Sequence, residues 1–311
     1  MIARRQRQMC IRDRYTDSDL AKPIIGVANM WIETMPCNYN HREMAQYVKE
    51  GIRAAGGTPM EINTISVSDG VSMGTEGMKG SLISREVIVD SIEVATRGHS
   101  FDGLVILVAC DKTIPAQLMA AASANIPAIS LAVGPMLTGS WRGERLGACT
   151  DCRRQWGRYR AGELDDQEII DVGQQLSTTA GTCMVMGTAS TMALMTEALG
   201  MMLPGSATVP AVHAERLRIA EATGERAVEL IEENLIPSSI INEFSLSNAF
   251  RVMLAVGGST NALIHMTAVA GRLGIKVDLQ KLDDMSRNTP VIVDLKPSGE
   301  NYMEDLFRAG G

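Results

Sequence analysis

The chain has 311 residues, of which 45% are hydrophobic and 21% are charged, and its formal net charge is −7. This is the composition of a globular protein long enough for one large domain or two ordinary ones. The negative charge and the lack of a basic stripe interleaved with aromatic residues argue against a nucleic-acid partner, and no apolar run reaches the roughly 18 residues that a membrane span needs.

The first fourteen residues carry five arginines and show neither helical nor strand periodicity. A basic arm or a transit peptide is one interpretation. The string R-Q-R-Q-M-C-I-R-D-R resembles translated sequencing-adapter DNA, so we interpret residues 1–14, including Cys10, as a non-native extension. They lack the apolar core of a secretory signal, and six cysteines are too few for a disulfide scaffold. A reducing cytoplasm is therefore the predicted location.

Strands and helices alternate after residue 14. Residues 22–28 form the apolar run of a buried strand. Residues 44–55 have apolar side chains at helical spacing, and Gly56-Gly57 ends that helix. A second strand is predicted over residues 60–65, before a polar, glycine-rich loop.

The next helix is predicted to start at the N-cap Ser84 and to continue through Arg97. A strand over 104–109, a helix over 115–125 and a strand over 127–133 complete this half. This alternation predicts βαβ units, and hence an α/β fold with a mostly parallel sheet flanked by helices.

The second half is predicted to be mainly helical, with a last strand over residues 290–294. The mixed charges of the helix predicted over residues 214–235 indicate a solvated face. The methionines of this second half indicate core packing. The chain stops at Gly311 without a closing helix, which we interpret as truncation. Helical spacing covers residues 167–176, 190–199, 214–235 and 247–273.

Chemically active side chains follow three of the predicted strands. They are Cys37, Asp69 and the triplet Cys110-Asp111-Lys112. A lone cysteine is more often a packed hydrophobe than a ligand, and an aspartate after a strand often only caps a helix. Sites in open α/β sheets form beyond the C-terminal ends of strands. Because three such loops converge on one edge, the pattern favours a site.

Two other motifs are weaker. Cys149 and Cys152 form a C-x-x-C pair, which can be a redox dithiol or half of a zinc site. The pair follows no predicted strand, has no partner pair, and the four histidines are scattered, so we interpret it as structural or incidental. The segment Gly257-Gly258-Ser259-Thr260 opens a predicted helix and is either an anion site or a simple cap.

The stretch C-D-K-T-I-P-A-Q-L-M-A at Cys110 resembles the first signature of the dihydroxy-acid and sugar-acid dehydratases, a family of iron–sulfur enzymes. Other segments resemble the family in the same order, over about residues 15 to 311. They are T-M-P-C-N-Y-N, N-T-I-S-V-S-D-G-V-S-M-G, S-R-E-V-I-V-D-S-I-E, T-C-M-V-M-G-T-A-S-T-M-A, L-P-G-S-A-T-V-P-A, G-G-S-T-N-A and D-L-K-P-S-G.

The resemblance implies a ligand set. Cys37, Cys110 and Cys183 would hold a 2Fe-2S cluster, and the presence of Cys37 favours that cluster over the 4Fe-4S type. Asp69, Asp111 and a carbamylated Lys112 would bind Mg²⁺. Cys149 and Cys152 match no family ligand. Residues 15–311 would be the N-terminal cluster- and Mg-binding α/β domain, truncated at its C-terminal end.

The resemblance also implies a reaction. Iron with an open position acts as a Lewis acid on a hydroxyl, and Mg²⁺ prefers oxygen ligands. The enzyme would convert a 2,3-dihydroxy carboxylic acid to a 2-keto acid, with a serine base from a C-terminal domain that this chain lacks. We therefore expect no catalytic base in this chain and an inactive fragment.

The substrate stays open between two branches. D-G-V-S-M-G resembles the dihydroxy-acid branch, which makes precursors of valine, isoleucine and pantothenate. M-G-T-A-S-T-M and Ala116 resemble the sugar-acid branch, which acts on aldonates such as arabinonate or xylonate. We favour the first and expect a homodimer of the full-length protein. A non-enzymatic thiol or metal-binding module is the remaining alternative.

Overall fold

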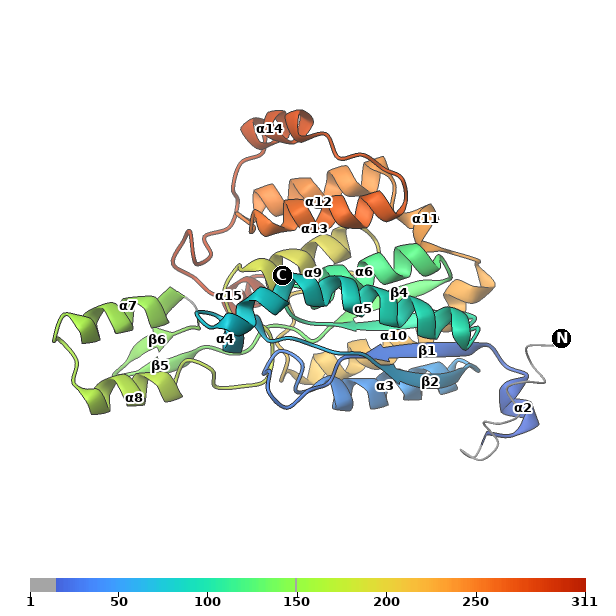
Figure 1. Cartoon of the computed structure of the whole chain (residues 1–311), viewed down its shortest axis with the longest axis horizontal. Helices are drawn as coiled ribbons and strands as arrows, with labels where there is room; N and C mark the ends of the chain where they lie inside the picture. Colours follow the sequence, from blue (N-terminus) through green and yellow to red (C-terminus); the bar gives the residue numbers. More distant parts are fainter. Residues whose placement is uncertain (1–14, 149) are drawn as a thin grey trace.

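The computed structural model describes residues 15–148 and 150–311 and is built around a four-stranded sheet (Figure 1). All the strands are parallel, in the order β2-β1-β3-β4. Every residue of three strands is buried, as expected for a parallel sheet covered on both faces. The strands are β1 (Ile24–Asn29), β2 (Thr58–Asn63), β3 (Gly103–Val108) and β4 (Ala128–Ala132).

Three helices connect successive strands, and shorter turns of helix flank them. Helix α6 ends at Ala124, and the left-handed backbone of its C-cap residue Asn125 (φ 49°) terminates it. The connecting helices are α3 (His41–Ala54), α5 (Lys79–Gly98) and α6 (Thr113–Ala124). The short elements are α2 (Asp17–Leu20), α4 (Asp69–Ser72) and the 3₁₀ helix η2 (Glu76–Met78).

The second half of the described chain contains a small hairpin and nine helices. The hairpin and the two helices after it form an arm, residues 139–174, that extends to the left of the sheet in Figure 1. The elements are β5 (Gly139–Trp141), β6 (Glu144–Leu146), α7 (Thr150–Arg160), α8 (Asp166–Gln174), α9 (Thr188–Ala198), α10 (Ala214–Glu232), α11 (Pro237–Ile240), α12 (Glu243–Ala255), α13 (Asn261–Arg272), α14 (Leu279–Asn288) and α15 (Met303–Arg308).

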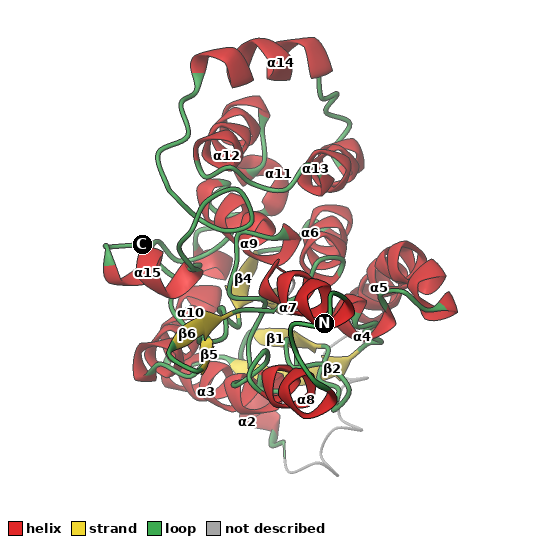
Figure 2. Ribbon diagram, turned by 90° about the vertical axis from the view of Figure 1, so that its left-hand side faces the viewer, coloured by secondary structure: helices red, strands yellow, loops and turns green. Residues whose placement is uncertain are grey.

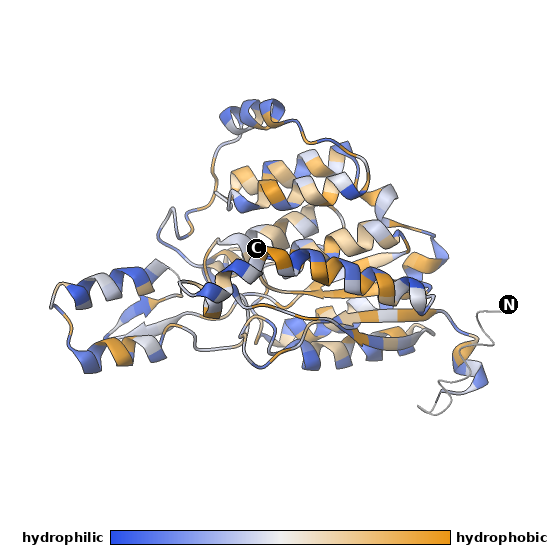
Figure 3. Cartoon of the chain, in the orientation of Figure 1, coloured by the Kyte–Doolittle hydropathy of each residue, from blue (hydrophilic) through white to orange (hydrophobic). Residues whose placement is uncertain are grey.

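Each face of the sheet has its own core. Alternate strand residues such as Val105 and Leu107 pack against α3 and α10, while Ile106 and Val108 pack against α5, α6, α9 and α13 on the other face. Figure 2 shows α12 and α13 stacked beyond α9 and α6 on this second side, and Figure 3 shows that apolar residues concentrate in the strands and inner helices. The alternation follows from the two-residue period of a strand.

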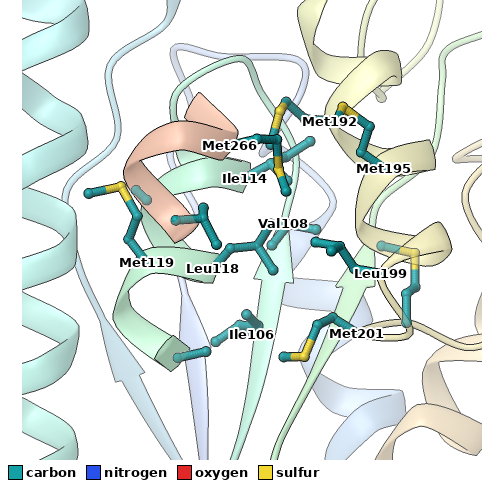
Figure 4. Close-up of a cluster of buried hydrophobic side chains, with 14 of the residues drawn as sticks. Ile106, Val108, Ile114, Leu118, Met119, Met192, Met195, Leu199, Met201 and Met266 are labelled. Atoms are coloured by element: carbon teal, nitrogen blue, oxygen red, sulfur yellow. The ribbon is translucent and has the colours of Figure 1, made fainter. Parts of the chain in front are cut away.

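The predicted methionine core is confirmed. Met192, Met195 and Met201 are fully buried and Met202 is nearly so, and three of them lie around Ile106 and Val108 in Figure 4. Helix α10 agrees only in part with its prediction as a solvated face, because one side packs on the sheet and on α3 and buries the side chain of Arg216 completely.

The α/β fold with a parallel sheet is confirmed, but several predicted boundaries are wrong. Ser84 is not an N-cap: α5 begins five residues earlier, continuous with η2, and Ser84 is buried inside it. The helix predicted over residues 247–273 is two helices, separated at Gly257, where the backbone has a φ of +61°. The last strand predicted over 290–294 does not form; these residues are an extended loop.

Among the helices that the structure describes, none has the length and apolar character needed to span a membrane. Residues 1–14, predicted to be a non-native extension, lie outside the described residues.

Candidate functional site

The three loops with predicted ligands meet at one edge of the sheet. Cys37 follows β1, Asp69 follows β2 and Cys110 follows β3. The chain passes from β1 outward to β2 and then returns to place β3 on the other side of β1. In open α/β sheets, this reversal leaves a crevice at the carboxyl ends of the strands, where ligands bind. The predicted convergence is therefore observed.

Two of the predicted cluster cysteines are in contact. The thiols of Cys37 and Cys110 are hydrogen-bonded to each other, and both side chains are 6% exposed. The pKa of the Cys37 thiol lies well above its usual value, first because of this hydrogen bond and then because of burial. Cys183 and Asp111 are close enough to add to the shift through their charges.

A buried ion pair joins two of the predicted Mg²⁺ ligands. Lys112 Nζ lies 2.5 Å from Asp69 Oδ2, and the hydroxyl of Ser81 donates to Asp69 Oδ1 at 2.5 Å. Both carboxylate oxygens of Asp69 are thus occupied by donors. The ammonium of Lys112 therefore balances the negative charge of Asp69, the same charge that would attract a bound cation.

Asp111 is held by the beginning of α9. Its carboxylate accepts hydrogen bonds from the backbone N–H of Ala189 and from the Thr188 hydroxyl. Its pKa is nevertheless raised, chiefly by burial and then by the negative charge of Asp69. The negative charge of Asp69 thus opposes the ionisation of Asp111, and a bound cation would offset this repulsion.

The glycine-rich segment before α13 supports α9. Ser259 Oγ lies 2.9 Å from Thr188 Oγ1, and the Asn261 amide donates to the same oxygen at 3.2 Å. The Ser259 backbone N–H donates to the Thr191 hydroxyl at 2.9 Å. The N-cap residue Thr260 makes no side-chain capping hydrogen bond, so the predicted simple cap is not observed. The segment instead braces the helix that holds Asp111, and the anion site stays a prediction.

A cavity of about 260 Å³ lies beside these groups. Its lining includes Asp111, Cys183, Thr188 and the exposed Arg153 of the arm. Such a volume suits a small organic acid. A larger groove, about 680 Å³, runs along α3 between Arg42 and His213 and contains none of the predicted ligands.

Sequence patterns did not identify two residues near Lys112, His265 and Arg85, because the four histidines are scattered along the chain. His265 is 2% exposed, and its Nδ1 lies 3.1 Å from Arg85 Nη1. Burial lowers its pKa to about 4, with smaller effects from Arg85 and Lys112. No local sequence motif identifies this histidine, because α13 comes close to the site only once the chain has folded.

The donor atoms suit the implied metals by type. Three thiols are soft ligands for iron, and carboxylates are hard ligands for Mg²⁺. Within the described residues, no three His, Cys, Asp or Glu side chains surround a single point as ligands of one ion. A two-iron cluster divides its thiolates between two irons, and the implied Mg²⁺ set includes a modified lysine, so neither set needs such a triplet.

The C-x-x-C pair remains outside this arrangement. Cys149 lies outside the described residues, and Cys152 is on α7. The expectation that the pair follows no strand is wrong, since β6 ends at Leu146, but β6 belongs to a two-stranded antiparallel hairpin separate from the main sheet.

Comparison with known proteins gives one family. Residues 22–311 match the family model described as dihydroxy-acid/6-phosphogluconate dehydratase N-terminal. The chain is 47% identical over 296 residues to dihydroxy-acid dehydratase 1 of Methanosarcina acetivorans, covering 95% of this chain and 53% of that protein.

Two further relatives are equally similar in extent. Identity is 45% to the dihydroxy-acid dehydratase of Caldanaerobacter subterraneus subsp. tengcongensis, with 95% of this chain and 53% of that protein covered. It is 43% to the dihydroxy-acid dehydratase of Pyrococcus abyssi, with 95% and 54% covered. The chain thus spans about half the length of the curated relatives it matches.

Proposed function

The chain belongs to the dihydroxy-acid/6-phosphogluconate dehydratase family, whose N-terminal domain it matches, and from this we propose that it is the metal-binding part of a hydro-lyase. The reaction is the conversion of a 2,3-dihydroxy carboxylic acid to a 2-keto acid. The observation that carries the proposal is the meeting of Cys37, Cys110, Asp69 and Lys112 at the β1/β3 crevice.

We propose that Cys37, Cys110 and Cys183 hold a 2Fe-2S cluster. The contact between the first two thiols and the proximity of the third support this assignment. Because thiolates are the ligands, and the Cys37 thiol holds its proton strongly, cluster binding must release protons from these side chains. Held by these three cysteines, the cluster would supply Lewis acidity toward an oxygen of the substrate.

The Mg²⁺ ligands are proposed to be Asp69, Asp111 and Lys112 as its carbamate. An ammonium would repel Mg²⁺, whereas a carbamate supplies an anionic oxygen of the kind that Mg²⁺ prefers. Support comes from Asp111, whose pKa is raised by burial and by the charge of Asp69. Carbamylation would also free Asp69 Oδ2 from the ammonium that now contacts it.

The bound metals would supply Lewis acidity, which makes the 3-hydroxyl a better leaving group and the C2 proton more acidic. The residues of this chain would orient the metal ligands and enclose the substrate. The α9 N-terminus holds Asp111 in place, and the cavity beside Cys183 accommodates a small acid. A serine outside these 311 residues is proposed to remove the C2 proton, consistent with relatives about twice as long.

For the substrate, we propose a dihydroxy acid of branched-chain amino acid biosynthesis. The names of the relatives at 43–47% identity support this choice. The alternative is a sugar acid such as arabinonate or xylonate, which the segment M-G-T-A-S-T-M and the buried Ala116 favour. We further propose a cytoplasmic homodimer for the full-length protein.

Anaerobic iron–sulfur reconstitution of the chain tests the metal assignment. We expect a brown protein with iron and sulfide in equal amounts, about two of each per chain. Cys37→Ser, Cys110→Ser and Cys183→Ser should each remove the colour. Cys152→Ser is the matched control and should leave iron and sulfide unchanged.

Zinc in place of iron, or a reversible disulfide lost with Cys152→Ser, would instead support a thiol module. If the chain binds no iron, the same test on a protein of the relatives' full length separates two causes. Iron there would mean that the second half is needed for these cysteines to retain the cluster; no iron there would make the assignment wrong.

A further inference from the structure

His265 carries a buried nitrogen that has no hydrogen-bond partner among the described residues. His265 belongs to α13, and this helix lies on the same side of the sheet as α5 and α6 (Figure 2). Nδ1 is 3.1 Å from Arg85 Nη1, and Nε2 has no hydrogen-bond partner in the described part of the chain. A buried polar atom without a partner destabilises a protein unless a ligand or modification satisfies it.

The proton of the imidazole can be assigned to this orphaned nitrogen. A guanidinium has only donors and does not deprotonate in proteins. Nδ1 of His265 must therefore accept from Arg85, which leaves the N–H on Nε2. The missing partner is consequently an acceptor, and an oxygen atom is the common acceptor for such a donor.

The charged groups that act on the His265 ring are Arg85, Lys112 and Asp69. Arg85 is paired with Glu86 through its other nitrogens. Asp69 has no oxygen left without a donor, because Ser81 and Lys112 each occupy one. The Asp111 carboxylate, which also acts on Lys112, is engaged by Ala189 and Thr188. These groups therefore leave His265 Nε2 without an acceptor in the described part of the chain.

On the basis of the proposed function, we propose that this acceptor is the carbamate of Lys112, and that His265 positions it through an Nε2–H···O hydrogen bond. In the modification, the deprotonated Nζ attacks the carbon of CO₂. A C–N bond forms, one C=O bond gives its electron pair to oxygen, and the proton of Nζ passes to water. The side chain changes from a cation to an anion that can accept from His265.

The carbamate can be observed directly by ¹³C NMR of the full chain supplied with ¹³CO₂ and Mg²⁺. We expect His265→Phe, which keeps a ring but has no donor, to lower the carbamate signal about tenfold, as the loss of one hydrogen bond to a charged group implies. His265→Gln keeps an acceptor for Arg85 and a donor, and should restore most of the signal. His99→Gln changes an exposed histidine and should have no effect.

A second measurement uses the unaltered chain, so it does not depend on whether a variant folds. With ¹⁵N-labelled histidine, the Nε2–H of His265 should move to a hydrogen-bonded shift when CO₂ is added. A shift on adding a 2-hydroxy acid, but not CO₂, would mean that the acceptor is a substrate oxygen, and the proposal would be wrong.

The outcomes separate this inference from the proposed function. An equal carbamate signal in the unaltered chain and in His265→Phe would overturn only the role of His265. No carbamate in the unaltered chain, with iron and sulfide still bound, would overturn the assigned Lys112 modification and this inference with it, while leaving the cluster assignment intact.

Discussion

Lys112 and Asp69 are 43 residues apart in the sequence, yet Lys112 Nζ and Asp69 Oδ2 are 2.5 Å apart in the fold. Their side chains are 12% and 7% exposed. A surface pair of equal length, Lys79 with Glu76, is 78% and 87% exposed. The two pairs differ in burial and not in distance, which makes them a natural comparison.

Asp69→Asn should destabilise the metal-free protein in CO₂-free buffer by about 3–5 kcal/mol, because it leaves the Lys112 ammonium buried without its counterion. Glu76→Gln should change the free energy of unfolding by less than about 0.5 kcal/mol. Urea denaturation measures both. Adding Lys112→Met to Asp69→Asn should recover most of the loss; if it recovers nothing, the pair is not coupled.

Asp111→Asn should weaken Mg²⁺ binding at least about tenfold, since one anionic ligand is removed. Because the pKa of Asp111 is raised, protons should compete with Mg²⁺ at a higher pH than at an ordinary aspartate, so the affinity should fall as the pH falls through that raised pKa. Calorimetric titration checks both effects. Asp90→Asn, on the exposed side of α5, serves as the control; equal losses in the two variants would count against Asp111 as a ligand.

His41 should make the fold sensitive to acid. Its ring is buried, and neither nitrogen has a hydrogen-bond partner among residues 15–148 and 150–311. Burial lowers its pKa from 6.5 to about 3. Between these values the unfolded chain binds a proton that the folded chain does not, so stability is lost as the pH falls from about 6.5 toward 3. The loss from this residue is about 2 kcal/mol at pH 5.

His41→Leu should therefore flatten the stability profile between pH 7 and pH 5 in metal-free protein, and should not reduce stability at pH 7, because it removes two unpaired polar atoms. Urea midpoints across this range measure the slope. His99→Leu, at an exposed position, should leave the slope unchanged. A profile as steep in His41→Leu as in the parent would assign the acid sensitivity to other groups.

Tyr302→Phe should destabilise the junction between the arm and the C-terminal segment. The Tyr302 hydroxyl donates to Asp151 at 2.7 Å and accepts from Lys296 at 2.8 Å. Losing this donor leaves a buried carboxylate oxygen less satisfied, at a cost of about 1–3 kcal/mol. The surface hydroxyl of Tyr159, 2.8 Å from Asp166, gives the control: Tyr159→Phe should change stability by less than about 0.5 kcal/mol. Similar midpoints for both variants would contradict the prediction.

The sheet and the meeting of its three loops were predictable because the signals are local. Apolar runs mark β1, β3 and β4, and in a parallel sheet their carboxyl ends share one edge. The polar residues that follow each run must therefore lie near one another, as Cys37 and Cys110 do. That argument needs no tertiary detail.

The rest depends on tertiary packing. The start of α5 was misplaced because Ser84, a good N-cap residue, is buried in the helix and donates instead to the carbonyl of Ser81. The hairpin of the arm has strands of only three residues, too short for a periodic signal. His265 reaches Arg85 across 180 residues, and no local pattern indicates such a contact.

The contact between α9 and Asp111 also implies an order in which the parts of the site form during synthesis. Ala189 and Thr188 reach Asp111 only after β4, the arm and the loop through Cys183 have been made and folded back. Contacts between distant segments close large loops and form slowly. During synthesis, Cys37 and Cys110 emerge long before α9, so there is an interval in which two thiols are exposed and the third is absent. We therefore expect the two thiols to be open to oxidation until Val133 and the segments after it have folded against them.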